Sequence, residues 1–127
     1  MSRSAGYYAG DDGSRTKLAG AMNILMSGNV YVYYGEELGM KGSGKDENKR
    51  APMYWSTEAA PSICSGPPDM DDIEMKFPAY DGQKEDPYSI WNYYRQALHI
   101  RNAFPSVAES ICSPVISSQG VVTIAAF

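Results

Sequence analysis

The sequence predicts an α/β fold, and three patterns in it carry that prediction. Apolar residues recur at helical spacing over residues 15–26. After a short turn, the run Val30–Tyr34 contains only β-branched and aromatic residues, which is typical of a parallel strand buried on both faces. A second stretch with helical periodicity covers residues 87–104. A helix, a short turn and a buried strand together form half of an α/β unit.

The composition is that of a globular chain. Of the 127 residues, 43% are hydrophobic and 20% are charged, which excludes a disordered tail and leaves room for one domain at most. No apolar run approaches the roughly 20 residues that cross a bilayer, and no signal peptide opens the chain, so we expect no membrane segment. The net charge of −4 argues against a nucleic-acid partner.

The first helix has one apolar stripe, made of Leu18, Ala21, Met22 and Leu25. Either Asp12 or Ser14 can cap its first turn, and Gly28 suits the position after its last turn. The stretch 35–85 that follows the strand has little periodicity, and an irregular segment of this length is usually a functional loop or a small subdomain. Within it, Pro67-Pro68-Asp69 resembles the start of a short helix.

The second helix has the apolar stripe Ile90, Tyr94, Ala97 and Leu98. Asp86 as N-cap and Pro87 at the first helical position predict its start, and Pro105 predicts its end. Residues 115–116 and 121–124 predict two short strands joined at Gln119-Gly120. Because one buried parallel strand cannot form a sheet and a hairpin alone is marginal, we expect the chain to be a piece of a larger protein.

Two motifs resemble ligand-binding loops. The segment Gly39–Asp46 has nearly the spacing of a P-loop, but Asp46 replaces the Ser or Thr that binds magnesium, so a charged surface loop is favoured. The acidic cluster Asp69–Glu74 lacks the central glycine and final glutamate of an EF-hand, so a solvated helix start is favoured over calcium binding. Cys64 and Cys112, with a single histidine in the chain, lack the spacing of a zinc site.

Four side chains stand out as candidates for a binding cleft. Glu36 and Glu37 directly follow the predicted strand, where α/β barrels place their chemistry, although neighbouring side chains point apart and at most one faces a cleft. The alternative is that one of them accepts a structural hydrogen bond. Arg50 and Trp55 bring a guanidinium and an aromatic ring into one loop, a combination that suits carbohydrate binding. The alternative for Trp55 is that its burial pins the loop.

In their order along the chain, four segments resemble the C-terminal part of the catalytic barrel of the α-amylase family of glycoside hydrolases: 18–26, 28–40, 46–56 and 86–101. The resemblance makes them the seventh helix, the eighth strand, its long loop and the eighth helix of a (β/α)₈ TIM barrel. It assigns residues 1–105 to this barrel and residues 106–127 to the beginning of a C-terminal β-sandwich domain. Cys64 and Cys112 would then belong to different domains, so we expect both thiols to be free.

The resemblance implies an enzyme that acts on α-glucans such as starch, maltooligosaccharides or related α-glucosides by a retaining mechanism with two carboxyl groups. In the family the catalytic acids follow strands four, five and seven, and the last belongs to an Asn-His-Asp motif that would stand just before Arg3. No such motif occurs in this sequence, so we expect no catalytic residue here and no activity of the chain alone. The substrate-side candidates that carry over are Arg3, Glu36, Glu37, Arg50 and Trp55.

The resemblance also implies the partners. We expect the parent enzyme to bind an α-glucan, the rest of the barrel to cover this segment, and the isolated segment to self-associate. We expect no cofactor in this segment, while calcium remains an option elsewhere in the parent enzyme. The alternative function is a self-standing, non-catalytic carbohydrate-binding or interaction module, which would have to cover Val30–Tyr34 with its own residues.

Overall fold

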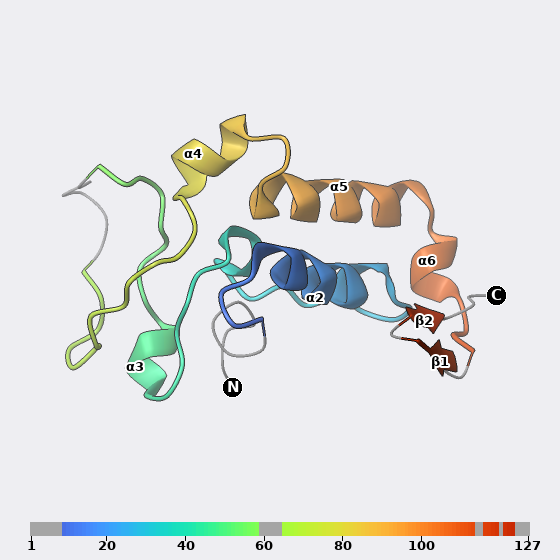
Figure 1. Ribbon diagram of the computed structural model, residues 1–127, viewed down its shortest axis with the longest axis horizontal. Helices are drawn as coiled ribbons and strands as arrows, with labels where there is room; N and C mark the ends of the chain where they lie inside the picture. The colour runs from blue at the N-terminus through green and yellow to red at the C-terminus, as the bar shows by residue number, and fades with distance from the viewer. Residues whose placement is uncertain (1–8, 59–64, 114–115, 120, 124–127) are drawn as a thin grey trace.

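The computed structural model describes residues 9–58, 65–113, 116–119 and 121–123 (Figure 1). Two helices form its centre, because α2 (Gly13–Leu25) and α5 (Ile90–Ala103) pack along each other. The shorter elements are η1 (Glu36–Leu38), α3 (Asp46–Lys49), α4 (Tyr80–Glu85), α6 (Ser106–Glu109), β1 (Ile116–Ser118) and β2 (Val121–Thr123). None of the described helices is long and apolar enough to cross a membrane.

Helix α2 begins two residues before the predicted start and ends one residue before the predicted end, and one of its two candidate N-caps is confirmed. The Asp12 carboxylate accepts a hydrogen bond from the Arg15 amide at 2.8 Å, which confirms Asp12 as the N-cap. Gly28 has a positive φ of 89°, but its amide donates to the Ala108 carbonyl of α6 and not to α2. The last carbonyls of α2 bind the Arg101 side chain instead, so α5 supplies the C-terminal cap.

The predicted start of α5 is wrong by three residues. Ser89 is the N-cap, since its hydroxyl accepts from the Asn92 amide at 3.1 Å. Asp86 and Pro87 lie before the helix, and the Asp86 carboxylate accepts from the Tyr88 amide in a turn. The helix ends at Ala103 with Phe104 as its C-cap, one residue before the predicted end.

Helix α2 buries a different face from its apolar stripe. Thr16, Gly20 and Ile24 are buried, spaced four residues apart along one face, whereas Leu18 of the predicted stripe is 61% exposed. Ile24 packs with three residues of α5: Ile90, Tyr94 and Ala97. The stripe therefore remains without a cover among the described residues, because α5 occupies the other face.

The predicted strand at Val30–Tyr34 is not a strand in the described structure. Residues 29–33 are irregular, because a strand needs a neighbour to share backbone hydrogen bonds and none of the described residues supplies one. Asn23 Nδ2 donates a hydrogen bond to the Tyr31 carbonyl of this segment at 2.7 Å. Tyr31 is 79% exposed, so the predicted burial on both faces is also absent.

The remaining predictions divide between confirmed and wrong. The stretch 35–85 is largely irregular where it is described, as predicted. Asp69 does not begin a helix: it has a φ of 66° in a turn closed by a hydrogen bond from Met70 to Pro67. The predicted hairpin is confirmed, since β1 pairs antiparallel with β2. The outermost predicted strand residues, 115 and 124, lie outside the described residues.

Candidate functional site

The site predicted from the sequence is centred on the sharp turn after residues 29–34. Gly35 and Gly39 adopt positive φ angles of 82° and 66°, which side chains other than glycine rarely tolerate. Between them η1 carries Glu36 and Glu37, and the turn closes when the Met40 amide donates to the Gly35 carbonyl at 2.9 Å. The Tyr-Gly-Glu-Glu sequence therefore folds into a compact turn that presents two adjacent carboxylates.

Two tyrosines tie this turn to the loop that carries Arg50. The Tyr33 hydroxyl donates to the Lys49 carbonyl at 3.1 Å, and the Tyr34 hydroxyl donates to the Ala51 carbonyl at 2.9 Å. These contacts hold the backbone on both sides of Arg50 next to the end of the predicted strand. The adjacent tyrosine rings lie with centroids 4.9 Å apart, so the pair forms one unit.

The two carboxylates have different surroundings. Glu36 lines a cavity of about 390 Å³ together with Asn23, Tyr31 and Tyr94, and Glu37 does not line it. Only one of the two faces this cavity, as their adjacent positions suggest. Glu37 Oε2 is buried without a hydrogen-bond donor among the described residues.

Both carboxylates affect the pKa of the Tyr94 hydroxyl. Burial is the main cause that raises the pKa of its hydroxyl far above the ordinary value, and the negative charges of Glu36 and then Glu37 raise it further. The Tyr94 ring comes from α5 and is almost fully buried. The floor of the cavity is therefore a protonated phenol next to a carboxylate, which can donate and accept hydrogen bonds from a polar ligand.

The structure does not bring Arg50 or Trp55 into this cavity. The Arg50 guanidinium is exposed and pairs with Asp46 at 3.5 Å and with Glu47 at 3.4 Å, both on α3. Trp55 is 47% exposed and packs edge to face on Tyr80 of α4, with ring centroids 5.7 Å apart. Trp55 is thus partly buried against Tyr80 and partly exposed. Arg3 lies outside the described residues.

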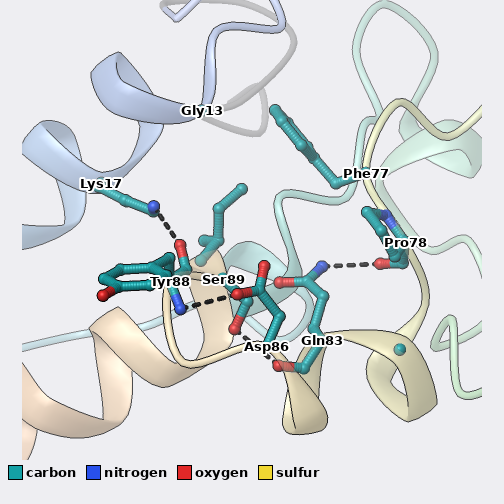
Figure 2. A pocket seen from close by; sticks show the side chains of 10 residues that line it. Gly13, Lys17, Phe77, Pro78, Gln83, Asp86, Tyr88 and Ser89 are labelled. Atoms are coloured by element: carbon teal, nitrogen blue, oxygen red, sulfur yellow. Dashed lines mark hydrogen bonds between the residues drawn. The ribbon is translucent and has the colours of Figure 1, made fainter.

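Sequence reasoning missed Gln83, whose side chain is hydrogen-bonded to the turn that contains η1. Its buried side chain donates to the carbonyls of Leu38 at 2.9 Å and Pro78 at 2.7 Å, and accepts from the Trp91 amide at 3.1 Å. Figure 2 shows Gln83 beside Pro78 and Ser89 in the wall of a second pocket. One amide side chain thus joins η1, α4 and α5. No pattern in the local sequence marks this glutamine, because its partners lie up to 45 residues away.

The acidic cluster does not fit a calcium site. Asp71 is occupied on both oxygens, by Lys45 Nζ at 2.6 Å and by Asn48 Nδ2 at 2.8 Å. Those two hydrogen bonds, with the Asn48 bond the larger cause, lower the pKa of the Asp71 carboxyl. In the described part of the chain no three His, Cys, Asp or Glu side chains gather in a metal-binding group. The contacts instead pin the loop at Asp71 to α3.

The comparisons with known proteins agree on one family. The family model described as the alpha amylase catalytic domain matches residues 1–110. The chain is 33% identical over 104 residues to alpha-amylase SusG of Bacteroides thetaiotaomicron, a match that covers 79% of this chain and 14% of the relative. It is 30% identical over 109 residues to alpha-amylase 3 of Dictyoglomus thermophilum, covering 74% of this chain and 19% of the relative.

A solved structure matches the fold as well. Eubacterium rectale Amy13B superimposes with a TM-score of 0.82 and 48% sequence identity over 89% of this chain. The superposition covers 22% of that structure. The chain therefore spans less than a fifth of the length of these two curated relatives.

Proposed function

Because the chain belongs to the α-amylase catalytic-domain family, we propose that it forms part of a glycoside hydrolase that acts on α-glucans with retention of configuration. The observation that carries this proposal is the family match over residues 1–110. Relatives that bear the name alpha-amylase support the substrate class. Retaining glycosidases use one carboxylate as nucleophile and a second carboxyl group as acid and base, on opposite sides of the scissile bond.

Within the (β/α)₈ barrel we assign α2 to the seventh helix, residues 29–34 to the eighth strand and α5 to the eighth helix. The order of helix, extended segment, long loop and helix supports this assignment. It also accounts for the irregular backbone at 29–33, since both neighbouring strands would come from the rest of the barrel. The β1–β2 hairpin suits the beginning of the following β domain.

In this proposal the chain builds one wall of the cleft and supplies none of the catalytic acids. Glu36 is the carboxylate best placed to face substrate, because it lines the cavity beside Tyr94. Trp55 is partly exposed and offers an aromatic ring for a sugar to stack on, and Arg50 lies on the loop held by the two tyrosines. Glu37 and Arg3 are proposed as supporting residues of the same wall.

The experiment compares two polypeptides on soluble starch. The longer natural polypeptide that carries residues 1–127 should release reducing sugar, and proton NMR of the fresh product should show the α-anomer. The 127-residue chain should release none above a boiled control, because the double displacement needs both carboxyl groups. Formation of the β-anomer by the longer protein, or hydrolysis by the repurified short chain, contradicts the proposal.

The isolated chain should also self-associate through its uncovered apolar surface. That surface combines the stripe of α2, with Leu18 and Met22, and the side chains of Tyr31, Val32 and Tyr33. Each Å² of this apolar area that a second chain buries contributes about 25 cal/mol to association. Light scattering at micromolar concentration should therefore give a mass above 13.9 kDa. A cooperative monomer would instead favour the alternative, a self-standing carbohydrate-binding module.

A further inference from the structure

A second surface feature lies away from the predicted cleft, where Tyr88 separates two cavities. The first, of about 200 Å³, lies between α2, α4 and the start of α5 (Figure 2). The second, of about 260 Å³, continues past Tyr88 to Tyr93 and Gln96. Lys17, Tyr88 and Ser89 line both. We call this surface the Tyr88 ridge, meaning Tyr88 with the two flanking cavities.

The Tyr88 ring is exposed, but its backbone is held firmly. Its side chain is 81% exposed, among the most exposed large side chains described. Its amide donates to Asp86 Oδ1 at 2.9 Å, and its carbonyl accepts from Lys17 Nζ, as Figure 2 shows. The next residue, Ser89, is buried as the N-cap of α5. An aromatic ring presented on a fixed backbone loses little conformational entropy when a ligand stacks on it.

The chemistry of the ridge suits a neutral polyhydroxyl ring. The faces of the Tyr88 and Tyr93 rings offer apolar area for stacking against the C–H face of a pyranose. Around them stand an ammonium, a carboxylate and an amide, from Lys17, Asp86 and Gln96, which together donate and accept hydrogen bonds. The opposite charges of Lys17 and Asp86 cancel, so the rim favours neither a phosphate nor a cationic peptide.

The Tyr88 ridge shares no lining residue with the cavity at Glu36. On α2 the ridge uses Lys17 and the Glu36 cavity uses Ala19 and Asn23. On α5 it uses Tyr93, whereas Tyr94 points into the core. Successive helical residues point about 100° apart, so the two sites open in different directions.

We propose that the Tyr88 ridge is a non-catalytic binding site for a glucan chain, separate from the cleft. Its preference for α-linked glucose rests on the proposed function of the parent enzyme; the recognition of a neutral sugar ring rests on the ridge alone. The site would hold a polymeric substrate on the outer wall of the barrel, between α2 and α5.

Affinity electrophoresis of the 127-residue chain tests this proposal. Native gels contain either soluble starch or hydroxyethylcellulose, a β-linked glucan, at increasing concentration. The wild-type chain should be retarded by starch and much less by hydroxyethylcellulose. Tyr88→Ala should raise the dissociation constant for starch about tenfold, because the stacking surface is lost. Tyr88→Phe keeps the ring and should retain the retardation.

Phe104→Ala is the matched control, since Phe104 is an exposed aromatic residue at the other end of α5. It should migrate like the wild type in starch, and circular dichroism should show the same helix content for all variants. Wild-type migration that starch does not change, or retardation that survives in Tyr88→Ala, overturns the proposal. Equal retardation by both glucans overturns the α-linked preference. None of these outcomes depends on hydrolysis, so the proposed function is tested separately.

Discussion

Gly20 of α2 lies directly against the Tyr94 ring of α5. A β-carbon at position 20 would stand 2.4 Å from Tyr94 Cε2, far inside van der Waals contact. The absence of a side chain at Gly20 thus lets the two central helices approach and keeps Tyr94 at the base of the Glu36 cavity. This contact leads to the first prediction.

Gly20→Ala should lower the free energy of unfolding by about 1 to 3 kcal/mol, although alanine is the better helix former. The reason is that the buried Tyr94 ring cannot move aside without disturbing Ile24. Gly13→Ala is the control, because its β-carbon would meet Phe77 at an ordinary 3.4 Å. Urea denaturation followed by circular dichroism measures both. Equal stability of Gly20→Ala and the wild type would show that the helices separate without cost.

Arg101→Met should destabilise the chain by about 3 kcal/mol. The buried guanidinium donates to Ile24 O at 2.7 Å, to Met26 O at 2.8 Å and to Gly28 O, and methionine leaves these carbonyls without that donor. Arg95→Met removes an exposed arginine that lies 5.2 Å from the Trp91 ring and should cost about 0.5 to 1 kcal/mol. The two variants are compared by urea denaturation, and similar losses would rule out a capping role for Arg101.

Stability should fall at alkaline pH because of Tyr94. Burial, followed by the charges of Glu36 and Glu37, raises the pKa of its hydroxyl in the folded chain. The unfolded tyrosine ionises near pH 10, so above about pH 10 the unfolded state loses a proton that the folded state keeps. The free energy of unfolding then falls by about 1.4 kcal/mol per pH unit more in the wild type than in Tyr94→Phe. If the free energy of unfolding fell equally with pH in the two proteins, Tyr94 would not be the cause of the alkaline loss.

Cys112 should be a free thiol with raised reactivity. Its sulfur lies 3.1 Å from the Ser27 hydroxyl, and that contact, helped by the Ser27 amide, lowers the pKa of the Cys112 thiol. In a Cys64→Ser background, the rate of alkylation by iodoacetamide should reach half its maximum at a lower pH than in Cys64→Ser/Ser27→Ala. Without reductant, the alkylated wild type should gain two adducts by mass spectrometry. If the alkylation rate reached half its maximum at the same pH in both variants, Ser27 would not lower the pKa of the Cys112 thiol.

The candidate site illustrates what sequence patterns can and cannot resolve. Sequence patterns put Glu36 and Glu37 directly after a strand that the described structure lacks, whereas their divergence followed from their adjacency in the chain. The role of Gln83 did not follow, because its hydrogen bonds join segments that are distant in sequence. Sequence patterns also did not predict that Arg50 forms ion pairs with Asp46 and Glu47 of α3.

The sequence by itself determined the local elements of this protein: the two long helices and the hairpin of β1 and β2. These depend on periodicity, capping and turn residues, which act over a few neighbouring positions. Tertiary structure alone decided which face of α2 is buried, and left the backbone at residues 29–33 irregular. The physical reason is that an apolar stripe must be buried by other side chains and a strand must share backbone hydrogen bonds with a neighbour. Residues distant in the sequence supply both kinds of contact.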